Sequence, residues 1–433
     1  MENVKQFIDF VAHSATAFQA VDTMTQFLKE AGYTQLLEHE SWNIAPGGRY
    51  FVTRNRSAVI AFAVPEHGCN HFQIVSSHSD SPTFKLKPNA ESESCGQYVR
   101  LNVEPYGGMI MSTWLDRPLS IAGRVMVREN NRLVTRLVDL DRETVVIPNM
   151  PIHFNRSVNS GYAFNPQVDL LPLYGGKDAK GKLMEEVAAS VGAKAEDIAA
   201  HDLFLYCRTP GTVWGAENEF FSCPRIDDLE CAFTSFKAFL DAETKDHVNV
   251  CALFDNEEVG SGTKQGADST FLEDVLMRTA SALGLDDAAA RAAFSASFMV
   301  SADNAHALHP NHPEKFDEQN RTLMNGGVVI KHNANQKYTT DAVSEAIFAE
   351  VCRKAGVPVQ HFSNRSDVAG GSTLGNIANA HVSLNTVDIG LAQLAMHSSY
   401  ETAGVEDVDH MINALRAFVS TNIVTYTDGD YSL

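Results

Sequence analysis

The sequence predicts an α/β protein with a mixed, largely parallel sheet that is flanked by helices and interrupted by an inserted β-rich domain. Three observations predict this fold. Apolar strand-like segments alternate with helical segments towards both ends of the chain, a pattern typical of sheets covered by helices. The stretch from about 97 to 148 instead carries short β-like segments separated by turn residues. The chain also has 433 residues, more than one ordinary core requires, so two domains are expected.

The N-terminal part predicts two helices followed by strands. Apolar residues recur at helical spacing within residues 1–40, and Gly32 is expected to end the second helix. The pattern changes to strand at 49–64, which ends in an unbroken apolar run. A further short strand at 72–77 leads directly into His78.

The remaining elements complete the expected architecture. Short strands are predicted at 98–103, 120–127, 133–138, 145–147 and 201–208, with a polar stretch at 176–200. Beyond them, helices are expected at 229–240 and 408–419 and strands at 248–254, 298–301, 328–331 and 382–387. The simplest arrangement is a catalytic domain built from residues 1–87 plus 225–433, into which residues 88–224 are inserted as a β-rich domain.

Composition indicates a soluble protein that is expected to stay in the cytoplasm. The hydrophobic fraction is 44% and the charged fraction 20%, as in ordinary globular proteins. No apolar run approaches the roughly 20 residues that span a bilayer, and the first residues lack the pattern of a signal peptide. The seven cysteines are scattered without CxxC spacing, which argues against disulfides and against a structural zinc knuckle. No membrane partner is therefore expected.

The formal net charge of −20 excludes some partners and constrains others. Nucleic-acid binding relies on Lys and Arg to neutralise phosphates, so no nucleic-acid partner is expected. A negative protein also repels anionic ligands. An acidic substrate would need a local cation in its pocket.

Two motifs place ligand-type side chains near predicted strand ends, where ligands of open α/β sheets gather. His78 ends a strand, and Asp80 could orient its imidazole on a metal. The alternative is a surface His beside an Asp. Asp227 and Asp228 lie where the β-rich segment meets a helix, and one of them could bridge two cations. Either could equally be a helix N-cap.

The strongest motif is the pair Glu257 and Glu258, directly after an apolar strand. Adjacent carboxylates are costly to bury without a positive partner, and adjacent side chains point in different directions. One could therefore bind a metal while the other transfers protons. The alternative is a solvated, charged turn.

Asp303 and His397 also follow apolar stretches, although each alone could be a cap or a core residue. Together with the preceding motifs they supply carboxylates and imidazoles without a thiolate, a set that suits Zn²⁺, Mn²⁺ or Co²⁺. Five ligands can hold two ions if one carboxylate bridges them. Paired ions of this kind occur in aminopeptidases, phosphatases and nucleases.

An ordered series of motifs extends almost from end to end of the chain. They lie at 7–10, 42–44, 51–55, 61–64, 78–82, 106–108, 112–117, 122–125, 147–148, 255–261, 301–310 and 394–398. This series resembles the aspartyl aminopeptidases, the two-zinc metallopeptidases of family M18. Two stretches qualify the match: residues 14–19 lack the two prolines and the His usual in the family, and the Gly-rich stretch 363–374 fits without assigned roles.

The resemblance implies a role for each candidate residue. The two zinc ions would be held by His78, Asp227, Glu258, Asp303 and His397, with Asp227 bridging. Glu257 would be the general base, and Asp80 would orient His78. The β-rich insert would mediate dimerisation within a tetrahedral shell of twelve subunits, in which His153 would reach the active site of a neighbouring subunit.

The resemblance also implies peptide substrates with an acidic N-terminal residue, Asp before Glu. For the compensating cation we favour Lys331, at the end of a predicted strand, over Arg365. A solvated strand-end lysine is the alternative for Lys331. Two other functions remain open: a two-zinc aminopeptidase of different specificity, and a catalytically silent shell that assembles or binds cargo.

Overall fold

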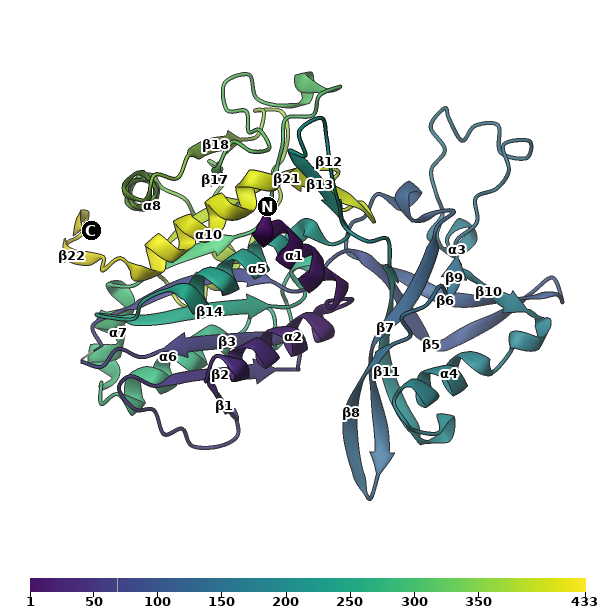
Figure 1. Ribbon diagram of the computed structural model, residues 1–433, viewed down its shortest axis with the longest axis horizontal. Helices are drawn as coiled ribbons and strands as arrows, with labels where there is room; N and C mark the ends of the chain where they lie inside the picture. Colours follow the sequence, from purple (N-terminus) through teal and green to yellow (C-terminus); the bar gives the residue numbers. More distant parts are fainter. Residues whose placement is uncertain (68) are drawn as a thin grey trace.

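In the computed structural model, which describes residues 1–67 and 69–433, the chain forms two lobes that are built on separate sheets (Figure 1). The larger lobe contains a nine-stranded sheet. In spatial order its strands are β1 (Thr34–Leu36), β2 (Arg49–Arg54), β3 (Ala58–Ala63), β14 (Val248–Phe254), β4 (Phe72–His78), β15 (Phe298–Ala302), β19 (Asn385–Gly390), β17 (Val328–His332) and β18 (Val359–Ser363).

The centre of this sheet is parallel. β4 pairs in parallel with β14 on one side and with β15 on the other, and β15 pairs in parallel with β19. Antiparallel pairing of β3 with β14 and of β17 with β19 makes the sheet mixed, as the sequence predicts. In this register Phe254 lies beside His78, so the residues after both strands meet at one edge of the sheet.

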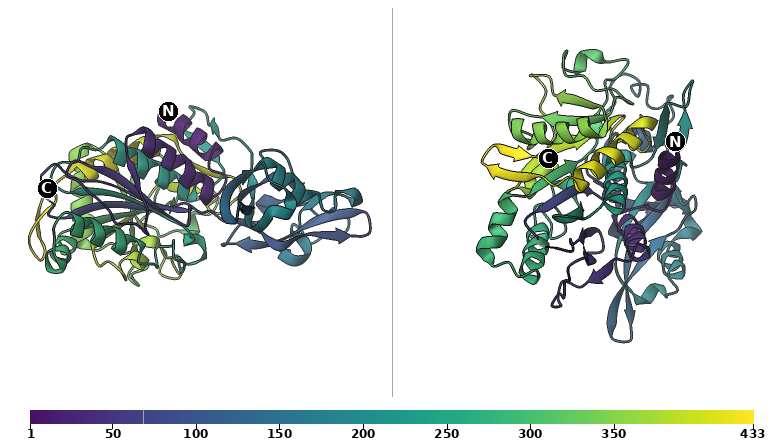
Figure 2. Two further views of the ribbon diagram at one scale, coloured as in Figure 1. Left: turned by 90° about the horizontal axis from the view of Figure 1, so that it is seen from below. Right: turned by 60° about the vertical axis from the view of Figure 1, so that its left-hand side comes forward.

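Helices cover both faces of the large sheet (Figure 2). One face packs against α1 (Glu2–Ala12), α2 (Ala17–Glu30), α5 (Ile226–Asp241), α8 (Ala342–Ala355) and α10 (Val405–Ser420). The other packs against α6 (Phe271–Ala282), α7 (Asp287–Ser295) and α9 (Leu374–Ala378). Every residue of β4, β14 and β15 is buried. Burial on both faces explains why β14 and β15 are mostly apolar without alternation in the sequence.

The smaller lobe is an antiparallel, closed sheet with its own core. Its strands are β5 (Thr83–Ser94), β6 (Tyr98–Tyr106), β7 (Pro118–Glu129), β8 (Arg132–Asp139), β9 (Val145–Val146), β10 (Leu173–Gly176) and β11 (Ile198–Cys207). β11 pairs with both β5 and β7, which closes the antiparallel sheet of the β-rich domain into a barrel. The helices of this lobe are α3 (Pro166–Asp169) and α4 (Lys182–Ser190).

Two smaller sheets and several 3-10 helices accompany the two main sheets. A five-stranded sheet contains, in order, β12 (Thr212–Trp214), β13 (Phe220–Cys223), β21 (Glu401–Gly404), β20 (Ala392–Leu394) and β16 (Ala305–His306), and β22 (Val424–Thr427) pairs with β23 (Asp430–Ser432). The 3-10 helices are η1 (Met111–Trp114), η2 (Lys177–Ala179), η3 (Ala195–Asp197), η4 (Glu257–Val259) and η5 (Pro313–Lys315). None of the helices in the described part of the chain is long and apolar enough to cross a bilayer.

A buried histidine pair lies at the amino ends of β4 and β14. The rings of His71 and His247 stack with centroids 5.1 Å apart, and His247 Nε2 lies 2.8 Å from the carbonyl oxygen of Val419. Burial lowers the pKa of His247 to about 4, and the neighbouring His71 adds to this effect. Asp246 and the Val419 carbonyl act in the opposite direction but are weaker in sum.

This pair predicts a loss of stability in mild acid. In the unfolded chain a His titrates near pH 6.5. The stability linked to the lowered pKa of His247 is therefore fully present above pH 6.5 and is lost as the pH falls towards 4. For His247 the loss amounts to about 2 kcal/mol between pH 7 and 5. Denaturant unfolding of His247→Gln should therefore show a flatter pH dependence than the parent protein, whereas the exposed His39→Gln should not. Equal slopes for His247→Gln and the parent would contradict the prediction.

Candidate metal centre

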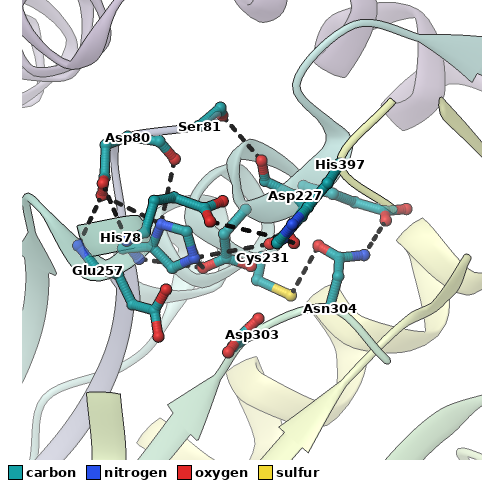
Figure 3. Close-up of polar contacts among 12 residues, drawn as sticks. His78, Asp80, Ser81, Asp227, Cys231, Glu257, Asp303, Asn304 and His397 are labelled. Atoms are coloured by element: carbon teal, nitrogen blue, oxygen red, sulfur yellow. Dashed lines mark hydrogen bonds and ion pairs between the residues drawn. The ribbon is translucent and has the colours of Figure 1, made fainter. Parts of the chain in front are cut away.

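The candidate ligands gather at the carboxyl edge of the parallel strands. His78 is the last residue of β4, and Glu258 follows β14 within η4. Asp303 comes directly after β15. Asp227 lies in the first turn of α5, and His397 follows β20. Segments far apart in the sequence thus converge on one buried site, which Figure 3 shows in close-up.

Asp227 lies between the two imidazole rings. Its Oδ1 is 3.6 Å from His78 Nε2, and its Oδ2 is 3.2 Å from His397 Nε2. Glu258 Oε2 lies 3.5 Å from the same nitrogen of His397. The potential ligand atoms form two groups that share Asp227, namely His78, Asp227, Asp228 and Asp303, and Asp227, Glu258 and His397. This sharing is the geometry expected of a carboxylate between two cations.

Asp80 connects His78 to the glutamate turn. Its carboxylate lies 3.3 Å from His78 Nδ1, and its carbonyl oxygen lies 3.1 Å from the same nitrogen. The backbone amides of Glu257 and Glu258 donate to the Asp80 carboxylate at 3.1 and 3.2 Å. The Tyr106 hydroxyl donates to it as well, at 2.7 Å. Asp80 therefore fixes both the ring of His78 and the start of η4, leaving Nε2 of His78 free to face Asp227.

The site contains more buried carboxylates than cations. Burial raises the pKa values of Glu258 and Asp303, and neighbouring carboxylates, Asp227 among them, add to the rise. Asp227 differs, because His397 and His78 overcome its burial and hold its pKa below the ordinary value. Within the described ranges, Oδ1 of Asp227 and Oε1 of Glu258 are buried without a hydrogen-bond partner.

Such oxygens are costly to bury unless a cation satisfies them. Carboxylates together with imidazoles, aimed at common points, are the donor set of Zn²⁺ and of similar divalent ions. The residues present therefore fit a pair of metal ions.

Glu257 and Lys331 border this set of ligands. The Glu257 carboxylate points into the same space as Asp303, and burial together with Asp303 and Asp80 raises its pKa to about 8 (Figure 3). Lys331 Nζ lies 3.7 Å from Asp303 Oδ2 and 5.5 Å from the ring centre of Tyr338. Burial opposes the charge of Lys331, but Asp303 and Tyr338 outweigh it and raise its pKa, so the buried amine stays cationic.

Two other candidates lie apart from this site. The Arg365 side chain is 39% exposed and forms an ion pair with Asp367 at 2.8 Å. His153 lies in an exposed turn between β9 and α3, and no hydrogen bond or ion pair within residues 1–67 and 69–433 links it to the site. Of the two cations considered for the acidic side chain of a substrate, therefore, Lys331 and not Arg365 lies at the site.

Two supporting residues, Glu401 and Asp228, were not predicted from the sequence. Glu401 accepts hydrogen bonds from the backbone amides of Asp227, at 3.1 Å, and His397, at 2.7 Å, and so holds two candidate ligands. Asp228, considered only as an alternative to Asp227, accepts from the amide of His78 at 3.0 Å. The adjacency of Asp228 to Asp227 could have indicated it. Nothing local in the sequence distinguishes Glu401 from an ordinary strand residue.

Comparison with known proteins identifies the relatives of this chain. Residues 10–419 match the family described as "Aminopeptidase I zinc metalloprotease (M18)". A "Probable M18 family aminopeptidase 2" of Clostridium acetobutylicum is 47% identical, over 95% of this chain and 96% of its own length. A "Probable aspartyl aminopeptidase" of Ricinus communis is 38% identical, over 95% of this chain and 94% of its own.

Two solved structures have the same fold. The "Ape4 and Nbr1 complex" contains a chain that superposes with a TM-score of 0.93 at 35% identity, covering 96% of this chain and 85% of that one. The "S. cerevesiae mApe1 dodecamer" gives a TM-score of 0.85 at 28% identity, covering 96% and 95% of the two chains. The relationship therefore extends over both lobes.

Proposed function

Because this chain belongs to the M18 family of zinc metallo-aminopeptidases, we propose that it is a two-zinc enzyme that removes acidic residues, Asp before Glu, from the N-termini of peptides in the cytoplasm. The observation that carries the proposal is the position of Asp227 between the imidazoles of His78 and His397, with the buried ammonium group of Lys331 beside the site. The first feature suits two cations, and the second suits an acidic side chain.

In this proposal two ions share the site. Asp227, Glu258 and His397 would hold one ion, and His78, Asp303 and the same Asp227 would hold the other. The grouping follows the distances between the ligand atoms, and it satisfies the orphaned oxygens of Asp227 and Glu258. Asp80 positions His78 without binding metal, because its carboxylate is already occupied by Tyr106 and the amides of η4.

The reaction is hydrolysis of the first peptide bond. Paired zinc ions supply Lewis acidity, which lowers the pKa of a water molecule and polarises the scissile carbonyl. Glu257 accepts a proton from the attacking water and returns it to the leaving amine. This role suits a carboxylate that makes no ion pair with any residue the structure describes and that burial makes more basic than usual. Lys331 pairs with the acidic side chain of the substrate.

Assembly is part of the same proposal. Residues 88–224 would form a dimerisation domain beside a catalytic domain of residues 1–87 plus 225–433, within a dodecamer like that of the related mApe1. The tetrahedral arrangement of the twelve subunits is what the family resemblance implies. His153 would then reach the site of a neighbouring subunit. The exposed apolar side chains Met150, Ile152 and Phe154, the last of them 84% exposed, flank His153 and favour an interface there.

Removal of metal tests the enzyme against a silent shell. We expect a chelator to abolish hydrolysis of an aspartyl reporter substrate. Two equivalents of Zn²⁺ per chain should restore it, because there are two ligand groups, which share the carboxylate of Asp227. Metal content read by mass spectrometry against activity provides the measurement. A fully loaded protein that hydrolyses no aminoacyl reporter would be the silent shell. A loaded protein that prefers leucyl over aspartyl and glutamyl reporters would be the aminopeptidase of different specificity.

A further inference from the structure

Two histidines and a glutamate converge at the far edge of the large sheet, away from the catalytic centre. β17 and β18 are the last two strands of that sheet and pair in parallel. His332 ends β17, His361 lies within β18, and Glu345 lies near the start of α8. Figure 1 shows α8 beside these two strands.

The backbone explains why these side chains meet. Ile330 pairs with His361, and His332 follows Ile330 by two residues, so both histidines project from the same face of the sheet. A capping box between Asp341 and Ser344 fixes the start of α8 beside them. The intervening Lys331 projects from the opposite face, towards Asp303. The cluster is therefore separate from the catalytic centre although the two adjoin in sequence.

The spacing of the three side chains matches that of metal ligands. His361 Nδ1 lies 3.3 Å from His332 Nε2 and 3.3 Å from Glu345 Oε1. The third separation, from His332 Nε2 to Glu345 Oε1, is 3.9 Å. Tetrahedral zinc with bonds of about 2.0–2.2 Å places neighbouring ligand atoms roughly 3.3–3.6 Å apart. Only the longest separation needs to shorten by a few tenths of an ångström.

Hydrogen bonds alone do not satisfy all three of these ligand-type atoms. If His361 Nδ1 carries the proton, that one hydrogen faces both Glu345 and the lone pair of His332. If His332 Nε2 carries it, His361 presents a lone pair to the Glu345 carboxylate. No lysine or arginine in the described parts of the chain forms an ion pair with Glu345. One cation could accept lone pairs from all three atoms at once.

We propose that His332, His361 and Glu345 bind one divalent transition-metal ion, with Zn²⁺ as the natural occupant. Two imidazoles favour Zn²⁺ and its neighbours over Mg²⁺ or Ca²⁺, which prefer oxygen ligands. The side chains are between 29% and 47% exposed, so water can complete the coordination. The ion fastens the end of β17 to β18 and α8 and has no part in peptide hydrolysis.

Equilibrium dialysis against buffered Zn²⁺, with metal counted by mass spectrometry, tests the site in the complete protein. The double variant His361→Gln/Glu345→Gln should bind one Zn²⁺ fewer per chain than the parent, with aspartyl reporter hydrolysis unchanged. The control His13→Gln/His39→Gln removes two exposed histidines that do not converge, and it should bind as many ions as the parent.

Glu345→Gln alone provides a second measurement that keeps the volume of the side chain. We expect the affinity for the additional ion to fall by about 10-fold or more, since a neutral amide is a weaker ligand than a carboxylate. Equal zinc stoichiometry in the parent and the double variant would overturn the proposal, as would loss of the same ion from the control. The activity assay reports on the catalytic centre separately, so the two sites are distinguishable.

Discussion

Replacing Glu257 with Gln should lower kcat on the order of 10³-fold while both zinc ions stay bound. The substitution keeps the shape of the side chain but removes its capacity to accept a proton. Asp80 holds the turn through the backbone amide of Glu257, so that contact survives the change. Steady-state kinetics on an aspartyl reporter, with zinc measured on the same sample, checks this expectation.

The neighbouring glutamate provides the matched control. Glu258→Gln alters the same turn by the same chemistry, but Glu258 lies 3.5 Å from His397 and belongs to a ligand group. We expect this variant to lose zinc as well as activity. A Glu257→Gln enzyme that contains its full zinc and turns over normally would show that another group accepts the proton.

The second large effect concerns substrate choice. Lys331→Met should reduce kcat/KM for an aspartyl reporter by roughly 10²–10³-fold, because a charge pair at contact distance and intermediate dielectric is worth about 4 kcal/mol. The value for a leucyl reporter should change little, since an apolar side chain makes no such pair. The ratio of the two kcat/KM values is the quantity to measure.

Two controls are needed to attribute a loss of selectivity to the charge of Lys331. Lys331 also lies beside Asp303, so zinc content must be measured to show that the loss of selectivity does not come from loss of metal. Arg365→Met removes a different cation, one that is already paired with Asp367, and should leave selectivity unchanged. If Lys331→Met retains the preference for Asp over Leu, the acidic side chain is recognised elsewhere.

Much of the large sheet is predictable because its strands are buried on both faces. The segments at 58–64, 72–77 and 248–254 predict strands, and the structure has strands there. The stretch 176–200 gave no such signal. Helix α4 within it buries only Leu183, Val187 and Ala188, too narrow a stripe to stand out among polar neighbours. The strand expected at 382–387 begins only at Asn385, since a turn precedes it.

Residues of the site could be predicted where the neighbouring sequence alone indicates their role. Glu257 and Glu258 are conspicuous because two carboxylates directly follow an apolar strand. Glu401 is different, because its function depends on backbone amides of α5 and of the loop after β20, which only the fold brings near it. The cluster of His332, His361 and Glu345 escaped notice for the same reason. Its members come from three elements whose register no single stretch of sequence reveals.

The parallel pairing of β4 with β14 has a consequence for the newly made protein. These strands are separated in sequence by the whole smaller lobe, and His397 is contributed by a still later segment. Contacts between such distant segments form late, after the intervening chain has been synthesised. With the proposed ligand set, a partly synthesised chain would therefore have carboxylates and imidazoles but no complete metal site. Hydrolysis at this site would begin only after the segment that contains His397 has been synthesised and has folded.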